Sequence, residues 1–224
     1  MTIALDQLAN SDDSTSGTGL FATIAEDLLA RGYSINPRAL PGGLANDLLQ
    51  HLHAMSAQQF VPAGIGREQE HMLNRQVRKD EICWINGESD AGRRWLAWAG
   101  ELRAYLNRRL FLGLFSFESH FAHYPPGGFY RRHLDAFKGE SNRIVSLVAY
   151  LNPDWQPGDG GELVLYPEEI DTGALRISPA LGTVAVFLSE EFEHEVLPAG
   201  RDRFSIAGWY RVNSSTAGRA DPPR

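Results

Sequence analysis

The chain has 224 residues and a mass of 24.9 kDa, a size that predicts one large domain or one domain with an appendage. Hydrophobic residues make up 43% of it and charged residues 22%, which excludes a disordered or fibrous protein. Its net charge of −7 argues against nucleic-acid binding, because such proteins usually carry a basic field. A single cysteine, a start without a signal-like segment and the lack of an apolar run of about 20 residues favour a soluble cytoplasmic protein that does not enter a membrane.

The first half of the chain has helical patterns. Residues 1–19 are mostly polar towards their end and predict a flexible N-terminal segment. Apolar residues then recur at helical spacing in three stretches, residues 20–31, 43–57 and 91–110. Between the second and the third lies a polar, basic stretch, residues 62–80, which predicts a functional or flexible loop before a short strand at 82–85. We expect the helical part, residues 20–111, to support a larger body.

The second half of the chain changes to the period of two that is typical of strands. Short runs separated by Gly, Pro and Asn predict strands at residues 115–124, 129–137, 143–152, 161–167, 173–178, 182–189, 194–198 and 203–213. Eight short strands after helices predict an α+β protein with a closed or double-sheet β-barrel, such as a jelly roll, over residues 115–213. Residues 20–213 would then form one catalytic domain, followed by a flexible tail at 214–224.

A candidate metal site is visible in the barrel region. His133 and Asp135 are two residues apart on a predicted strand, so both side chains should lie on one face of it. His194, at the start of a distant strand, would be the third ligand. Two imidazoles and one carboxylate on one side of a metal leave three positions open, as in non-haem Fe(II) oxygenases. The spacing alone is weak evidence, because a surface ion pair fits it equally well.

Arg203 strengthens this hypothesis. It lies nine residues beyond His194, on the next predicted strand, and a guanidinium is the natural partner of a carboxylate. An arginine deeper in the barrel than the metal would hold the far end of a dicarboxylate whose near end chelates that metal, and 2-oxoglutarate has this shape. Arg201 is the competing candidate, but it falls in a predicted turn and should face solvent.

Four segments in this order carry a family resemblance: HYPPGGFYRRHLD (123–135), RIVSLVAYLNPDW (143–155), GGELVLYP (160–167) and HEVLPAGRDRFSIAGWY (194–210). They resemble the Fe(II)- and 2-oxoglutarate-dependent prolyl hydroxylases of the hypoxia-inducible-factor type, and most closely their bacterial members, over about residues 75–213. The resemblance implies a double-stranded β-helix (a cupin-like jelly roll) of eight strands supported by N-terminal helices.

The resemblance also implies roles for individual residues. It makes His133, Asp135 and His194 the ligands of Fe(II). For the cosubstrate 2-oxoglutarate it implies a pocket formed by Arg203, Tyr124, Tyr150, Val148, Leu163 and Trp209. For the protein substrate it implies a groove and a covering segment with Arg78, Asp80, Tyr130 and Arg143. O2 would be the second cosubstrate, and ascorbate a further candidate cofactor. Without the resemblance, Arg78 and Asp80 would be read as part of a solvated charged loop.

The expected activity is hydroxylation of a prolyl residue in a protein, with release of succinate and CO2. By the same resemblance, the expected partner is elongation factor Tu. Two alternatives belong to other classes. One is a 2-oxoglutarate oxygenase that acts on a small molecule such as free proline, which would not need the loop at residues 62–80. The other is a non-enzymatic, cupin-like metal or oxygen sensor.

Overall fold

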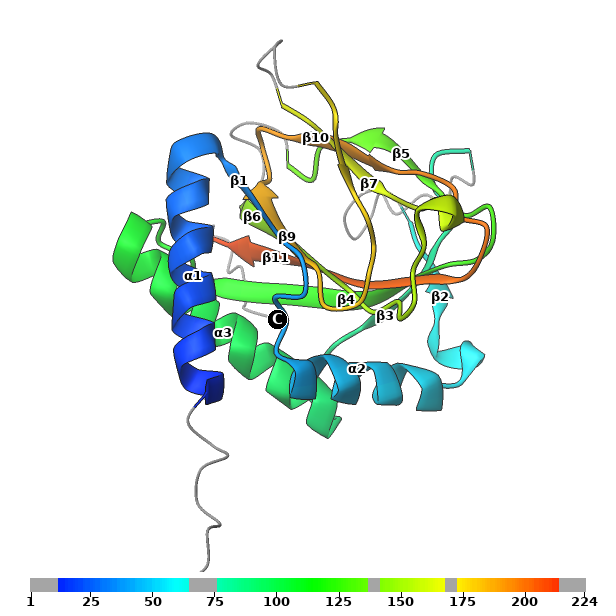
Figure 1. Cartoon of the computed structure of the whole chain (residues 1–224), viewed down its shortest axis with the longest axis horizontal. Coiled ribbons are helices and arrows are strands. Elements are labelled where there is room, and N and C mark those ends of the chain that lie inside the picture. The colour runs from blue at the N-terminus through cyan, green and yellow to red at the C-terminus, as the bar shows by residue number, and fades with distance from the viewer. Residues whose placement is uncertain (1–11, 65–75, 137–141, 168–172, 214–224) are drawn as a thin grey trace, which may run out of the picture.

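The computed structural model describes residues 12–64, 76–136, 142–167 and 173–213. Within them, three α-helices lie together on one side of two β-sheets (Figure 1). They are α1 (Asp12–Arg31), α2 (Gly42–Ala54) and α3 (Asp90–Leu110), and two short 3-10 helices cover Ala57–Gln59 and Pro157–Asp159. The predicted tail at 214–224 and the first 11 residues of the predicted N-terminal segment lie outside the described residues.

The first helix starts earlier than its sequence pattern indicates. It begins at Asp12, eight residues before the expected start at residue 20. Once a helix is formed, each added residue gains one backbone hydrogen bond at little further cost, which lets a helix extend beyond its amphipathic part. The predicted stop is confirmed, because Gly32 adopts a positive φ of 76° and its amide bonds the Leu28 carbonyl.

The larger sheet has seven strands within the described residues, in the antiparallel order β1-β9-β6-β11-β4-β3-β2. These strands are β1 (Tyr33–Asn36), β2 (Val61–Pro62), β3 (Glu81–Trp84), β4 (Ser116–Tyr124), β6 (Arg143–Tyr150), β9 (Val184–Leu188) and β11 (Arg203–Arg211). The sequence did not predict β1 and β2, which add edges to the barrel sheet.

The smaller sheet has the order β5-β10-β7-β8 and faces the larger one (Figure 1). Its strands are β5 (Tyr130–His133), β7 (Leu163–Tyr166), β8 (Leu175–Ile177) and β10 (Glu193–Val196). The eight strands β4 to β11 divide equally between the two sheets and switch sheets at each step except between β7 and β8, which pair with each other. This double-stranded β-helix confirms the predicted fold class.

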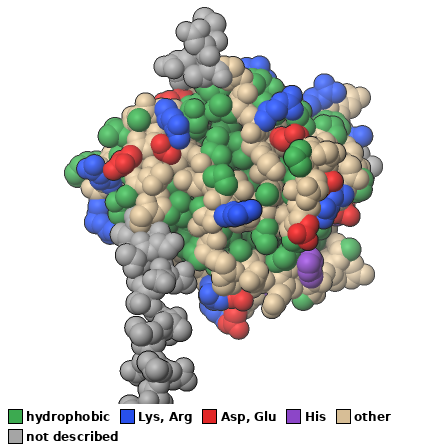
Figure 2. Space-filling model, in the orientation of Figure 1, with side chains coloured by type: hydrophobic (Ala, Val, Ile, Leu, Met, Phe, Trp, Pro, Cys, Tyr) green, Lys and Arg blue, Asp and Glu red, His purple; other side chains and the backbone are tan. Residues whose placement is uncertain are grey.

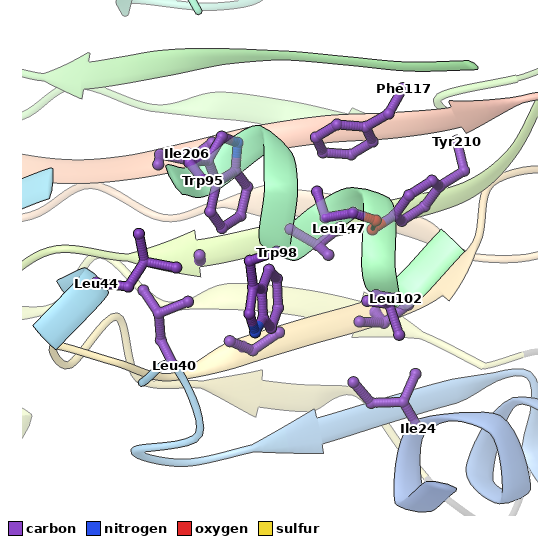
Figure 3. Packing of buried hydrophobic residues seen from close by; sticks show 14 of the residues in the cluster. Ile24, Leu40, Leu44, Trp95, Trp98, Leu102, Phe117, Leu147, Ile206 and Tyr210 are labelled. Atoms are coloured by element: carbon purple, nitrogen blue, oxygen red, sulfur yellow. Dashed lines mark hydrogen bonds between the residues drawn. The ribbon is translucent and has the colours of Figure 1, made fainter. Parts of the chain in front are cut away.

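The central strands of the larger sheet send their side chains to two different cores. On β6, Leu147 and its odd-numbered neighbours lie in one apolar cluster with Trp95 and Leu102 of helix α3 (Figure 3). The even-numbered Tyr150 points between the two sheets, where a second apolar cluster lies. This period of two determines which residues reach the barrel interior. The helices therefore cover one face of the larger sheet, and the opposite face is left to build a site.

The surface carries mixed charge. On the face shown in Figure 2, the basic and acidic side chains are interspersed, which agrees with the modest net charge of −7. In the described part of the chain, no helix has the length and apolar character needed to cross a bilayer.

Candidate active site

Two histidines meet across the smaller sheet. His133 on β5 and His194 on β10 are direct partners in the antiparallel register, and their ring centroids are 4.3 Å apart. Residues opposite each other in such a pair project to the same side of the sheet, so the pairing brings together two side chains that are 61 positions apart in the sequence. His194 is 6% exposed and also packs edge-on against Phe187.

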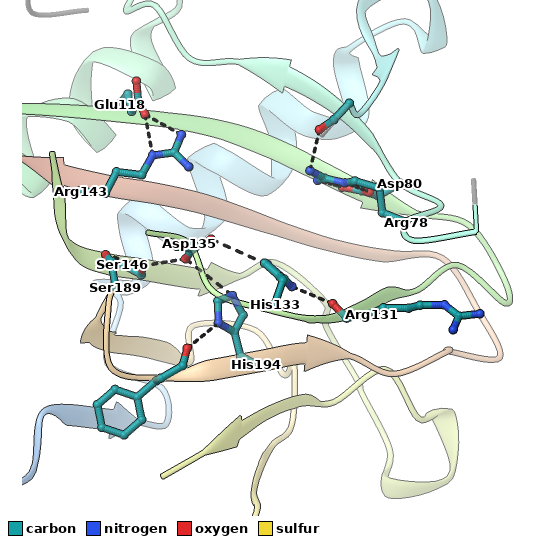
Figure 4. Close-up of polar contacts among 12 residues, drawn as sticks. Arg78, Asp80, Glu118, Arg131, His133, Asp135, Arg143, Ser146, Ser189 and His194 are labelled. Carbon is teal, nitrogen blue, oxygen red and sulfur yellow. Dashed lines mark hydrogen bonds and ion pairs between the residues drawn. The ribbon is translucent and has the colours of Figure 1, made fainter. Parts of the chain in front are cut away.

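Asp135 completes the cluster, but by a different route from the predicted one. Strand β5 ends at His133, so the prediction of a strand up to residue 137 is wrong, and Asp135 lies in a bend after it. The bend turns the carboxylate back towards the two histidines (Figure 4). Its Oδ1 lies 3.8 Å from Nε2 of His133 and its Oδ2 lies 3.6 Å from Nε2 of His194. The structure thus brings the three candidate ligands together, but through a turn and not through strand alternation.

Backbone carbonyls fix the orientation of both imidazoles. Nδ1 of His133 donates to the Arg131 carbonyl at 2.7 Å, and Nδ1 of His194 donates to the Phe192 carbonyl at 3.1 Å. A carbonyl can only accept, so each ring carries a proton on Nδ1, and Nε2 is the nitrogen available to a metal. Burial, helped by the proximity of His194, lowers the pKa of His133 to about 3, so this ring is neutral at pH 7.

The three side chains have the donor set that Fe(II) needs. Their ligand atoms all lie within 4.8 Å of one another. Burial raises the pKa of Asp135, but the two histidines, Arg143 and a hydrogen bond from Ser146 together outweigh it and lower the pKa to about 2. The cluster thus offers one carboxylate and the Nε2 atoms of two imidazoles, the facial set of non-haem Fe(II) oxygenases.

Arg203 lies at the start of β11 and is almost fully buried. It is 1% exposed, and its Nε donates to the Gly161 carbonyl at 2.8 Å while Nη1 donates to Oγ of Ser205 at 3.3 Å. Among the residues that the structure describes, no carboxylate forms an ion pair with it. A buried cation without a counter-ion is costly, so the site suits an anionic ligand. Arg201, in contrast, is exposed and lies 3.4 Å from Asp159.

Two tyrosines flank this guanidinium. Its central carbon lies 4.9 Å from the ring centre of Tyr124 and 5.2 Å from that of Tyr150. The hydroxyl of Tyr150 is buried and makes no hydrogen bond within the described residues. Burial raises the pKa of Tyr150 to about 12, against the opposing effect of Arg203, so the hydroxyl keeps its proton and can donate. A buried guanidinium without a carboxylate partner among the described residues, next to this hydroxyl, fits the distal carboxylate of 2-oxoglutarate.

The other predicted pocket residues also point into the barrel. Leu163 on β7 is buried in the cluster between the sheets, and Val148 on β6 packs against that cluster. Trp209 is 9% exposed and follows Arg203 on the same face of β11. The guanidinium of Arg143 lies 3.7 Å from the centre of the Trp209 ring, and Glu118 accepts from its Nη2 at 2.7 Å (Figure 4).

Arg78 and Asp80 form a buried pair rather than a solvated loop. Asp80 is 4% exposed and accepts from Nε and Nη2 of Arg78 at 2.7 and 2.6 Å. Burial lowers the pKa of Arg78, but the bonded carboxylate outweighs this and raises it above its usual value. Arg78 also lies 4.2 Å from the ring centre of Tyr130, which in turn stacks on His133 at 3.6 Å. Of the loop predicted at 62–80, residues 65–75 lie outside the described residues.

Sequence reasoning missed three residues that contact the site. Ser146 donates to Asp135, Ser189 bonds Ser146, and Gly161 accepts from Arg203. Serine is too common to be a signal on its own, whereas the Gly160-Gly161 pair inside a strand pattern could have indicated a close approach of another group. A Cβ at Gly161 would lie 3.2 Å from Cδ of Arg203.

Comparison with known proteins agrees with this geometry. Residues 119–211 match the model of the 2OG-Fe(II) oxygenase superfamily. A crystal structure of a prolyl-4-hydroxylase from Pseudomonas putida superposes with a TM-score of 0.77 and 41% sequence identity, covering 87% of this chain and 100% of that one. A prolyl hydroxylase from Trichoplax adhaerens, solved with a peptide fragment of the hypoxia-inducible factor oxygen degradation domain, superposes with a TM-score of 0.78 at 27% identity over 92% of this chain and 95% of that one.

Curated relatives match in part. The human Egl nine homolog 1 is 31% identical over 147 residues, which span 61% of this chain and 34% of that protein. A hypoxia-inducible factor prolyl hydroxylase of Caenorhabditis elegans is 36% identical over 94 residues, or 13% of its length. The chain thus spans about a third or less of these two relatives.

Proposed function

Because the chain belongs to the 2OG-Fe(II) oxygenase superfamily, we propose that it hydroxylates a prolyl residue of a protein, using O2 and 2-oxoglutarate and releasing succinate and CO2. One observation carries the proposal: the cluster of His133, Asp135 and His194 lies in the same barrel as Arg203, which is buried and has no carboxylate partner among the described residues. The first provides a metal site with open positions, and the second provides a fixed anion site deeper inside.

The chain's own residues would hold and orient both groups. Nε2 of His133, Nε2 of His194 and the Asp135 carboxylate would bind Fe(II). Arg203 and the Tyr150 hydroxyl would bind the distal carboxylate of 2-oxoglutarate. Because this dianion has a carboxylate at each end, that contact would determine which end faces the metal. The side chains of Leu163 and Val148 would exclude water along its length.

Metal and cosubstrate together supply the chemistry: O2 is reduced, 2-oxoglutarate loses CO2 to become succinate, and one oxygen atom enters succinate while the other enters a C–H bond of the substrate. The protein supplies placement. The open side of the site is lined by the Arg143 and Trp209 stack and by Tyr130 on His133. These residues, with Arg78 and Asp80, are our candidates for contact with the target segment.

We further propose elongation factor Tu as the protein substrate. Support comes from the sequence resemblance to bacterial prolyl hydroxylases and from the 41% identity to the Pseudomonas putida protein over its full length. The lining of the open side agrees with a polypeptide ligand, because aromatic faces and paired charges suit a proline ring and its flanking backbone.

The test is to incubate the purified protein with Fe(II), 2-oxoglutarate and purified bacterial elongation factor Tu. We expect succinate and, by peptide mass spectrometry, one added oxygen on a single proline, in equal amounts. The variant His133→Ala, which removes a ligand, should give neither product.

Parallel reactions separate the alternatives. Succinate formed only with free proline would contradict a protein substrate and favour the small-molecule enzyme. Hydroxyproline that appears in another protein of a bacterial extract, but not in elongation factor Tu, would retain the reaction and reject the partner. Metal binding without succinate from any of these mixtures would reject the enzyme in favour of a sensor.

A further inference from the structure

Two buried serines form a hydrogen-bonded chain that ends at the Asp135 carboxylate of the candidate metal site. Oγ of Ser146 donates to Oδ2 of Asp135 at 2.7 Å, and Oγ of Ser189 lies 2.9 Å from Oγ of Ser146. Ser146 is 1% exposed and Ser189 is fully buried. We propose that this pair positions Asp135 so that it binds the metal through one oxygen only, and thereby keeps a coordination position open for O2.

The direction of both hydrogen bonds follows from the donor count. Oγ of Ser146 donates to Oδ2 of Asp135 at 2.7 Å, because a carboxylate that binds a metal carries no proton and can only accept. A serine hydroxyl has one proton, which leaves Ser146 as the acceptor in its contact with Ser189. The order of donation is therefore Ser189 to Ser146 to Asp135. Each donor strengthens the next, because a hydroxyl that accepts a bond is a better donor.

The two serines are themselves held by sheet hydrogen bonds. Ser146 lies in the middle of β6, paired with Phe187 of β9 and Trp209 of β11. Ser189 follows β9, and its amide bonds the Ile144 carbonyl at 3.0 Å. Asp135, in contrast, lies in a bend outside any strand. The hydrogen bond from Ser146 thus connects Asp135 to the larger sheet, as Figure 4 shows.

The way in which Asp135 binds would determine how many coordination positions of a bound metal stay open. An octahedral metal has six positions, and three single-atom protein ligands leave three for water, 2-oxoglutarate and O2. A chelating keto acid takes two of them, so one remains. A carboxylate that turned to bind through both oxygens would take that last position. The bond from Ser146 occupies Oδ2 and opposes this turn, which makes Ser146 a positioning residue of the reaction.

The test counts metal-bound water and needs no prolyl substrate, so it can fail or succeed independently of the proposed reaction, although it rests on the proposed metal site. Mn(II) replaces Fe(II), and the relaxation rate of solvent protons reports exchangeable inner-sphere water. The key pair is Ser146→Val and Ser146→Thr, which have the same shape but differ by the hydroxyl. We expect Ser146→Thr to behave as the parent protein. For Ser146→Val we expect the water signal to fall by about a third without 2-oxoglutarate, and to vanish with it.

Two controls separate positioning from folding. Ser119→Ala removes another buried hydroxyl, one that accepts from Trp95 on the helix-facing side, and should leave the water count unchanged. Ser146→Ala serves if both larger side chains unfold the protein. If the variants without the hydroxyl bind Mn(II) and keep the full water signal in both states, Ser146 has only a packing role and the inference is wrong.

Discussion

Removal of the Arg203 guanidinium should abolish tight binding of 2-oxoglutarate while the metal site survives. The side chain is 1% exposed and has no carboxylate partner among the described residues, so a bound carboxylate would be its sole counter-charge there. Truncating one partner of a buried, hydrogen-bonded charge pair costs about 2 to 5 kcal/mol. A central value of about 3 kcal/mol corresponds to a dissociation constant for 2-oxoglutarate that is roughly 150-fold higher. Arg203→Met removes the charge but fills most of the volume, which limits the loss of packing.

The matched control is Arg201→Met, two residues away. That side chain is 45% exposed and pairs with Asp159 at the surface, so we expect less than about a twofold change. Arg203→Lys should recover only part of the affinity, since an ammonium cannot make the paired contact. Calorimetric titration of the Mn(II)-loaded proteins measures all three. If Arg203→Met binds within about threefold of the parent, or if Arg201→Met loses as much, the assignment of the anion site is wrong.

Three further predictions concern residues around the barrel. Tyr150→Phe removes a hydroxyl that lacks a partner in the ligand-free protein, so denaturant titration should show no loss of stability, or a gain of about 1 kcal/mol. The affinity for 2-oxoglutarate should fall about tenfold. A variant that is destabilised but still binds 2-oxoglutarate tightly would contradict this. Gly161→Ala forces a side chain onto a φ of +72° and against Arg203, and should weaken 2-oxoglutarate binding, while Gly158→Ala, with nothing within 4 Å, should not; equal affinities would refute the contact. Burial lowers the pKa of His120 to about 4 from 6.5, so the unfolded state binds more protons than the folded state below pH 6.5, and the free energy of unfolding falls as the pH drops towards 4. At pH 5 this residue should account for a loss of about 2 kcal/mol. His120→Met should lose that part of the pH dependence, and an unchanged slope would contradict the prediction.

Most of the barrel could be predicted from the sequence because its strands bury one or both faces. All eight predicted barrel strands are present, since residues such as Leu147 and Tyr150 alternate between two apolar clusters. The four-residue strand β1 could not be predicted in the same way. It is formed by pairing with β9 at the edge of the sheet, and so short a segment has too little periodicity of its own.

In the site, too, some features could be predicted from the sequence and others could not. The sequence offered His133, Asp135 and His194 as candidate ligands, and the register of β5 and β10 places the two histidines opposite each other. The position of Asp135 in a bend, the buried pairing of Arg78 with Asp80 and the serine contacts depend on where the two sheets meet. Such contacts between distant segments leave no periodic trace in one sequence.

The most direct test of the central claim is an isotope experiment under oxygen-18 gas. An extract of the source organism lacking the gene is incubated with the purified protein, Fe(II) and 2-oxoglutarate, and its peptides are analysed by mass spectrometry. We predict one oxygen-18 atom on a proline of a specific protein and one in succinate, and neither label with His133→Ala. Succinate labelled without any labelled prolyl residue, or hydroxyproline that carries only oxygen-16, would contradict a protein prolyl hydroxylase at this site.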